Sequence, residues 1–232
     1  MGAVIRLRRS SIARDSIGAL ALALDAKDPP SRHHADRVAR YAQAVGARLN
    51  LDARRLERLV AAALLHDIGV LGVPDALLQR DDELHPHELD IVREHAVIGE
   101  RILEAAGLHD IAPWVRHHHE RIDGRGYPDK LAGDAIPLES RIIGVVEALE
   151  TITASRYQRQ RRASAIDELD DHKGTQFDAA VTDALIELIV SGDLEGLEDP
   201  PLLQFTDYCR LHDPEWVVMH GGARRRLSSL PG

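Results

Sequence analysis

The residues best suited to do chemistry in this chain are His66 and Asp67, which follow the apolar run 61–65 and precede Ile68-Gly69. Such a run predicts a buried helix, and the glycine after it predicts the end of that helix. Where the backbone leaves helical geometry, adjacent His and Asp side chains can reach one ion. A neutral imidazole and a carboxylate suit Fe, Mn, Co or Zn. The pair alone is weak evidence, because His109-Asp110 repeats it without other ligand-type residues nearby.

Further ligand-type side chains fall on segments that are otherwise apolar. They are His34, His95, His118, His119, Glu147 and Glu150. An unpaired imidazole inside the apolar-periodic segment around His95 would be costly, and Glu147 and Glu150 share a helix face through their i,i+3 spacing. Each residue has an ordinary alternative, as a surface residue, a hydrogen-bonded core histidine or part of a charged stripe. Together they predict a dinuclear metal site in a helical scaffold.

Apolar periodicity near 3.6 residues predicts the helices that would carry these side chains. We expect helices over 17–24, 31–49, 52–66, 86–107, 111–119, 138–152, 163–169 and 178–190, a short turn at 74–78 and a Gly- and Pro-rich loop at 121–137. Ser31 and Asp52 are the expected N-caps of the second and third helices. Since no segment alternates as a strand would, the predicted fold class is all-α.

The composition agrees with a helical bundle. The 232 residues are 44% hydrophobic but only 3% aromatic, so the core must be built from Ala, Leu, Ile and Val. The net charge of −9 argues against DNA or RNA as a partner. Cys209 is the only cysteine of the sequence, which excludes an internal disulfide framework and fits a reducing compartment. Without an apolar span or a signal peptide pattern, we expect a cytoplasmic protein with no membrane span.

The compact domain is expected at residues 16–190. Residues 1–15 form an N-terminal segment, and residues 191–232 form a C-terminal extension. The texture changes after residue 190, where Asp199-Pro200-Pro201 is typical of a linker and residues 221–232 are typical of a loose tail.

In their order and spacing, these residues resemble the HD-GYP family, a branch of the HD superfamily of metal-dependent phosphohydrolases. The matching text is His34…Arg37-Val38, Ala62-Ala63-Leu64-Leu65-His66-Asp67-Ile68-Gly69…Pro74-Asp75, His95…Gly99, His118-His119-Glu120…Asp123-Gly124-Arg125-Gly126-Tyr127-Pro128, Gly133…Ile136-Pro137-Leu138…Arg141-Ile142, Arg156 and Gly174-Thr175-Gln176-Phe177-Asp178. The match covers about residues 28–188. The resemblance implies an all-α, HD-type helical bundle with two or three metals, often iron or manganese, that hydrolyses cyclic di-GMP.

The resemblance also implies a role for each matching residue. One metal would be held by His34, His66, Asp67 and Glu147, and Asp67 would bridge to a second metal held by His95, His118 and His119. The substrate-binding residues would be Tyr127, Arg156 and Gly126, while Glu120, Asp123 and Glu150 would orient the ligands from behind. His66 and Asp67 would be catalytic, because a hydroxide activated by both ions would attack phosphorus and release pGpG or GMP.

Four positions depart from the family pattern. Val70 replaces a Lys that helps to hold a phosphate, Glu147 replaces an Asp, and Ala96 replaces a Pro. Members with a third metal place an acid where this chain has Pro30, so we expect two divalent ions, iron or manganese.

Val70 and Glu147 leave a first alternative open, a degenerate module that binds metal and cyclic di-GMP without turnover and acts as a receptor. A second alternative is a relative that acts on another phosphoester, or a dinuclear iron oxygenase. Cyclic di-GMP is the expected partner. A diguanylate cyclase, a sensor protein and a second copy of the chain are further candidates.

Overall fold

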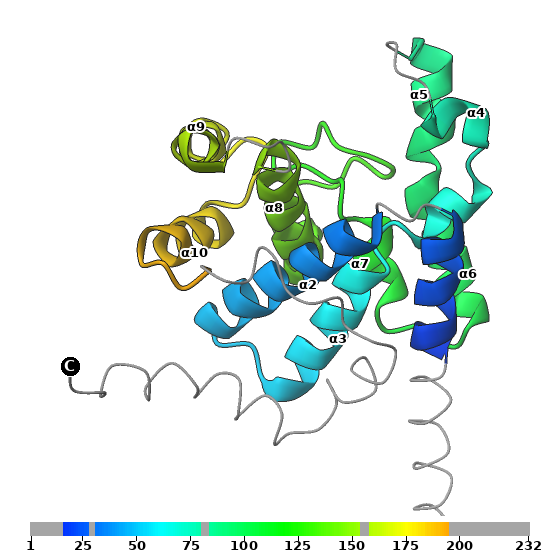
Figure 1. Ribbon diagram of the computed structural model, residues 1–232, viewed down its shortest axis with the longest axis horizontal. Coiled ribbons are helices and arrows are strands. Elements are labelled where there is room, and N and C mark those ends of the chain that lie inside the picture. The colour runs from blue at the N-terminus through cyan, green and yellow to red at the C-terminus, as the bar shows by residue number, and fades with distance from the viewer. Residues whose placement is uncertain (1–15, 28–30, 80–83, 154–157, 195–232) are drawn as a thin grey trace, which may run out of the picture.

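The computed structural model describes residues 16–27, 31–79, 84–153 and 158–194, and these residues form helices joined by turns and loops (Figure 1). After a helix over residues 16–27 come α2 (Ser31–Arg48), α3 (Ala53–Leu64), η1 (Ile68–Gly72), α4 (Asp75–Leu78), α5 (Pro86–Arg93), α6 (His95–Ala105), α7 (Ala112–Arg116), η2 (Gly133–Ala135), α8 (Leu138–Thr153), α9 (Gln158–Asp171) and α10 (Ala179–Val190). Extended residues in the described part pair only as two isolated bridges, Asp123 with Ala132 and Lys173 with Phe177. The predicted all-α class is confirmed.

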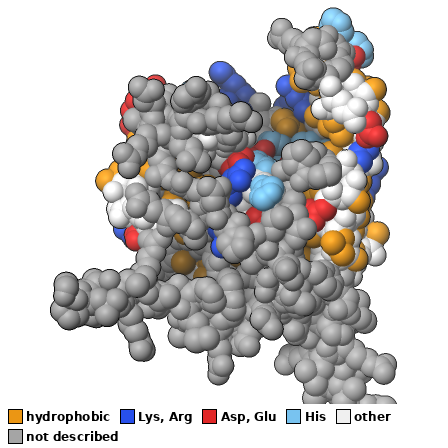
Figure 2. All heavy atoms as spheres, in the orientation of Figure 1, with side chains coloured by type: hydrophobic (Ala, Val, Ile, Leu, Met, Phe, Trp, Pro, Cys, Tyr) orange, Lys and Arg blue, Asp and Glu red, His pale blue; other side chains and the backbone are white. Residues whose placement is uncertain are grey.

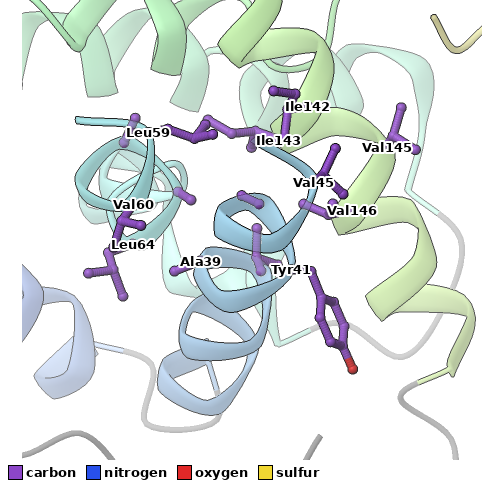
Figure 3. Close-up of a cluster of buried hydrophobic side chains, with 14 of the residues drawn as sticks. Ala39, Tyr41, Val45, Leu59, Val60, Leu64, Ile142, Ile143, Val145 and Val146 are labelled. Carbon is purple, nitrogen blue, oxygen red and sulfur yellow. The ribbon is translucent and has the colours of Figure 1, made fainter. Parts of the chain in front are cut away.

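The core lies where α2, α3 and α8 pack together (Figure 3). Each helix presents an apolar stripe, and the buried residues of the three stripes include Val38, Tyr41, Ala42, Val45, Leu59, Val60, Leu64, Ile142, Ile143, Val145 and Val146. Asp52 caps α3 as predicted, because its side chain accepts a hydrogen bond from the Arg55 backbone N–H at 2.9 Å. Aliphatic stripes thus fix the helices that carry the ligand-type residues.

The remaining helices flank this core on two sides. α9 and α10 pack against α8, and α6 packs against η1 and α7. α4 and α5 lie at the far end of the molecule, at the upper right of Figure 1, and α5 has no buried residue. None of the described helices is long and apolar enough to cross a membrane. Arg156, Cys209 and residues 195–232 lie outside the described residues.

Three predicted helices end or break earlier than the sequence suggests, each at a histidine. The helix expected to reach His66 ends at Leu64, the one expected over 86–107 breaks at Glu94, and the one expected over 111–119 ends at Arg116. In each case an imidazole Nδ1 hydrogen-bonds the carbonyl oxygen three residues back. A continuous helix would use that oxygen for its i+4 backbone bond, so the side chain competes with the helix.

A close backbone contact joins η1 to α6. A Cβ atom added at Gly69, in η1, would lie 1.8 Å from the His95 carbonyl oxygen and 2.6 Å from the Gly99 amide nitrogen of α6. Only glycine permits this approach. The contact sets His95 beside the turn that carries His66 and Asp67.

We expect Gly69→Ala to lower the free energy of unfolding by about 2 kcal/mol or more, because a rigid backbone has to move away from the new methyl group. Chemical denaturation monitored by circular dichroism measures the change.

Gly46→Ala is the matched control. Its added Cβ would meet the tips of Leu56 and Leu59 at 2.8 and 2.9 Å, and these side chains can rotate away. If the Gly69 variant were as stable as the Gly46 variant, the close backbone contact of Gly69 with His95 would not limit stability.

Candidate metal centre

Six of the predicted ligands gather into two groups. His34, His66 and Asp67 form one group and His95, His118 and His119 form the other, with the potential ligand atoms of each group within 4.8 Å of one another. They come from α2, from the turn after α3, from the start of α6 and from the turn after α7. Histidine side chains are visible near the middle of the face in Figure 2, beside acidic and basic side chains.

Asp67 lies between the two groups. Its Oδ2 is 3.2 Å from His66 Nε2, and its Oδ1 is 3.6 Å from His95 Nε2. Each oxygen therefore faces a different group, which is the geometry that a bridging carboxylate requires.

Backbone carbonyls orient three of the histidines. Nδ1 of His66 lies 2.8 Å from the Ala63 oxygen, Nδ1 of His95 lies 2.8 Å from the Val92 oxygen, and Nδ1 of His118 lies 2.5 Å from the Val115 oxygen. Because a carbonyl oxygen can only accept, each Nδ1 carries the hydrogen, and the neutral ring has its lone pair on Nε2. Three lone pairs are thereby directed into the centre.

A carboxylate performs the same task for His34. Glu150 on α8 is buried and binds Nδ1 of His34, while its other oxygen accepts hydrogen bonds from Arg37. His34 and Arg37 lie one turn apart on α2, so one carboxylate ties α2 to α8 and orients a ligand. The structure thus places Glu150 behind a histidine, as the sequence predicts.

The spacing of the imidazoles fits metal ions. The Nε2 atoms of His34 and His66 are 3.3 Å apart, and those of His95 and His118 are 3.5 Å apart. Two nitrogens bound to one ion at about 2.1 Å lie roughly 3.0–3.4 Å apart. With neutral imidazoles around a carboxylate, the donor set suits a first-row transition metal in each group.

Glu147 on α8, predicted to bind the ion of the His34 group, lies beside His118 of the other group. Its Oε2 is 4.0 Å from His118 Nε2, and its side chain is mostly buried. Burial, together with the neighbouring carboxylates of Asp67 and Glu150, raises the pKa of Glu147 to about 7. The residue faces the ligand groups, whereas Glu150, one turn later, faces α2.

The two groups differ in the protons that they hold. Burial disfavours a charged His66, but the adjacent Asp67 carboxylate outweighs burial and raises the pKa of His66 to about 9. The same contact keeps the pKa of Asp67 well below its usual value despite burial. Burial and neighbouring imidazoles lower the pKa of His119 to about 3 and that of His118 well below its ordinary value. At neutral pH and without a metal, His66 therefore holds a second proton that an ion must displace, whereas His118 and His119 are uncharged.

The loop over residues 121–137 forms one wall of the centre. Tyr127 stacks on His119, with ring centroids 4.8 Å apart and planes at 29°, and its amide lies 3.3 Å from the His119 carbonyl oxygen. Asp129 anchors the loop, since its carboxylate accepts hydrogen bonds from Arg116 and is 2.9 Å from His117 Nε2.

Two residues expected to orient ligands instead hold this loop. Glu120 accepts hydrogen bonds from the amides of Asp129 and Leu131, and Asp123 pairs with Arg121. Both carboxylates contact loop residues, so any support that they give the histidines would act through the loop.

Gly126, expected on the substrate side, is buried. An added Cβ would lie 2.4 Å from the Arg121 amide nitrogen, so the packing of the loop by itself requires glycine there. Arg156, also expected to contact substrate, lies outside the described residues. Val70 is half-buried and packs against the hydrophobic core.

The three backbone carbonyls were not predicted from the sequence. Neither was Arg93, whose guanidinium carbon lies 5.5 Å from the centroid of the Tyr127 ring. The sequence signal for the carbonyls is a ligand histidine at a helix end, whose Nδ1 can reach the i−3 oxygen. Arg93 stands two residues before His95, but no sequence signal connects it with Tyr127.

Comparisons with known proteins identify a matching domain family and similar sequences. A model of the HD domain family matches residues 19–181. The cyclic di-GMP phosphodiesterase response regulator RpfG of Xanthomonas campestris pv. campestris is 32% identical over 178 residues, which are 75% of this chain and 47% of that protein. The 3'3'-cGAMP-specific phosphodiesterase 3 of Vibrio cholerae is 39% identical over 138 residues, 59% of this chain and 30% of that protein. The chain therefore spans less than half the length of these relatives.

A solved structure gives the same fold. A cyclic GMP-AMP-specific phosphodiesterase of Vibrio cholerae superimposes with a TM-score of 0.62 at 21% identity, covering 87% of this chain and 53% of that chain. At this identity the likeness supports the helical fold alone.

We expect Glu150→Ala to weaken metal binding at the His34 group by about 10- to 100-fold, because His34 loses the acceptor that orients it. Isothermal titration of the metal-free protein with Mn²⁺ measures both groups. Glu104→Ala, an exposed change on α6, should alter neither. Equal weakening at both groups would contradict a positioning role for Glu150.

The two groups should also respond differently to pH. Binding at the His34 group must displace the proton that His66 holds with a pKa of about 9. Affinity there should rise about tenfold per pH unit from pH 6 to 8. The metal affinity of the His95 group should depend less on pH, because the pKa of His119 is about 3 and no proton has to leave that ring. The His95→Ala variant leaves the His34 group for titration, and the His34→Ala variant leaves the His95 group. Identical pH profiles of metal affinity in the two variants would contradict the prediction.

Proposed function

This chain belongs to the HD domain family and is of its HD-GYP type, and on that premise we propose that it is a metal-dependent cyclic dinucleotide phosphodiesterase. We further propose cyclic di-GMP as the substrate and pGpG or GMP as the product. The relatives that match are named for cyclic di-GMP or for 3'3'-cGAMP, so the proposal names the first of two closely related substrates.

The observation that carries the proposal is the position of Asp67 between two groups of converging Nε2 atoms. His34, His66, Asp67 and Glu147 would hold one ion, and His95, His118 and His119, with Asp67, would hold the other. Two such ions, when bound, neutralise phosphoryl oxygens and lower the pKa of a water molecule. We propose iron or manganese, since imidazole and carboxylate donors suit both.

The residues of the chain then position the substrate. Tyr127 stacks on His119 at the edge of the centre, where its ring can support a nucleobase and its hydroxyl can donate to a phosphate oxygen. Burial and the carboxylates of Glu147 and Asp67 raise the pKa of the Tyr127 phenol above its ordinary value. The hydroxyl therefore stays neutral and remains a hydrogen-bond donor at any working pH.

A receptor without turnover is the second candidate function. Val70 supports it, because this half-buried aliphatic side chain brings no positive charge to the substrate phosphate. Glu147 supports it as well, since its longer side chain can shift an ion, and a misplacement of about 1 Å can lower the rate about a hundredfold. Such a module would bind metal and cyclic di-GMP and would signal through a partner.

The proposal is tested by product analysis on protein purified without oxygen. After metal quantification, the protein is incubated with cyclic di-GMP or 3'3'-cGAMP in excess Mn²⁺ or Fe²⁺, and the products are separated by chromatography. We expect pGpG or GMP, with the rate lowered about 100-fold or more by His66→Ala and by Asp67→Ala, because each removes a ligand.

His109→Ala provides the matched control, since it alters an exposed His-Asp pair outside the centre. Its rate should equal that of the unchanged protein. Two bound metals per chain with binding but no turnover of either dinucleotide would favour the receptor, and turnover of 3'3'-cGAMP alone would replace the proposed substrate.

A further inference from the structure

An arginine stands at the edge of the metal centre without contacting the ligand groups. Arg93 is the last residue of α5, and its guanidinium carbon lies 5.5 Å from the centroid of the Tyr127 ring. Tyr127 also stacks on His119, with centroids 4.8 Å apart. Tyr127 therefore contacts both a ligand histidine and a positive charge.

The backbone beside Arg93 is fixed to the centre. The carbonyl oxygen of the preceding residue, Val92, is the acceptor for Nδ1 of His95 at 2.8 Å. This hydrogen bond holds the backbone next to Arg93 against the centre, although α5 has no buried residue.

The ion pair that Arg93 makes with Asp90 is exposed and can be exchanged for another anion. Its side chain is 50% exposed, and its ion pair with Asp90 has an N–O distance of 3.1 Å to a partner that is 72% exposed. Exposed pairs of this kind contribute little to stability and are screened by salt. By contrast, Arg37 binds the buried Glu150 and is committed to the structure.

The charge at the centre makes such a cation useful. Asp67, Glu147 and Glu150 bring three carboxyl groups, and Val70 is aliphatic. A cyclic dinucleotide carries two phosphodiester anions on one ring. When one of them lies over Asp67, the other lies one nucleotide away and needs its own positive partner.

We propose that Arg93 binds the second phosphodiester of the substrate, the one that is not cleaved. A guanidinium fork can donate two parallel hydrogen bonds to phosphate oxygens, and the Tyr127 ring would hold the nucleotide between the two phosphates. This inference rests on the proposed function, because it assumes a ligand with two phosphodiesters. Arg93 would thus favour a cyclic dinucleotide over a simple phosphodiester.

The test compares two substrates in Arg93→Ala. For cyclic di-GMP we expect KM to rise about tenfold or more, the effect of losing a charged hydrogen bond, while kcat changes less than about twofold. For bis(p-nitrophenyl) phosphate, which has a single phosphodiester, both constants should stay unchanged. Arg93→Lys, which keeps the charge but not the planar fork, should restore only part of the loss in KM.

Arg101→Ala is the matched control, because Arg101 is an exposed arginine on α6. This variant should leave KM and kcat unchanged for both substrates. Thermal melting of each variant checks that it is folded. Equal losses on both substrates would show that Arg93 acts on the centre itself. That result, or no change at all, would overturn the assignment.

The unchanged protein separates this inference from the proposed function. If it turns over no cyclic dinucleotide, the enzyme proposal fails, and the dissociation constant of cyclic di-GMP is measured on the Mn²⁺-loaded proteins. A constant about tenfold higher in Arg93→Ala would still support the inference. Equal constants would overturn it alone, and no binding by the unchanged protein would overturn both.

Discussion

The contact between Gly69 and the His95 carbonyl oxygen is the constraint on which the centre depends. It brings η1 and the start of α6 into backbone contact, and these segments carry or adjoin the residues that meet at Asp67. With a side chain at this position the two segments would have to separate. His95 would then move away from Asp67, and the carboxylate could no longer face both groups. Gly144 makes a similar approach, because an added Cβ there would lie 2.6 Å from the His118 carbonyl oxygen.

The imidazoles are oriented largely by the chain segments that carry them. His66, His95 and His118 each bond the carbonyl three residues back, so their orientation is set as soon as the local turn forms. His34 differs, because its acceptor is Glu150 on a helix distant in sequence. The first three imidazoles are therefore oriented by local hydrogen bonds, whereas the orientation of His34 requires α2 and α8 to be packed together. A dinuclear centre built this way has its Nε2 atoms directed inward before any ion arrives, which lowers the cost of binding.

Charge is distributed unevenly around this centre. The chain carries a formal net charge of −9, and carboxylates lie within the site itself. Two arginines near the centre bind carboxylates of the fold: Arg37 binds Glu150, and Arg116 binds Asp129 of the loop. Arg93 is half exposed beside Tyr127. An anionic substrate would meet its favourable potential at the edge of the site, where the ion pair of Arg93 with Asp90 is exposed to solvent.

Much of this protein could be read from its sequence, because the signals are local. Apolar periodicity predicts the helices, and the ligand-type residues stand out as polar groups in apolar segments, so the all-α class and the candidates for the centre follow without a structure. Helix ends at the histidines, the loop contacts of Glu120 and the position of Arg93 beside Tyr127 follow only from tertiary structure. They depend on which acceptors and rings lie within a few ångströms once distant segments pack, and spacing along the chain does not contain that information.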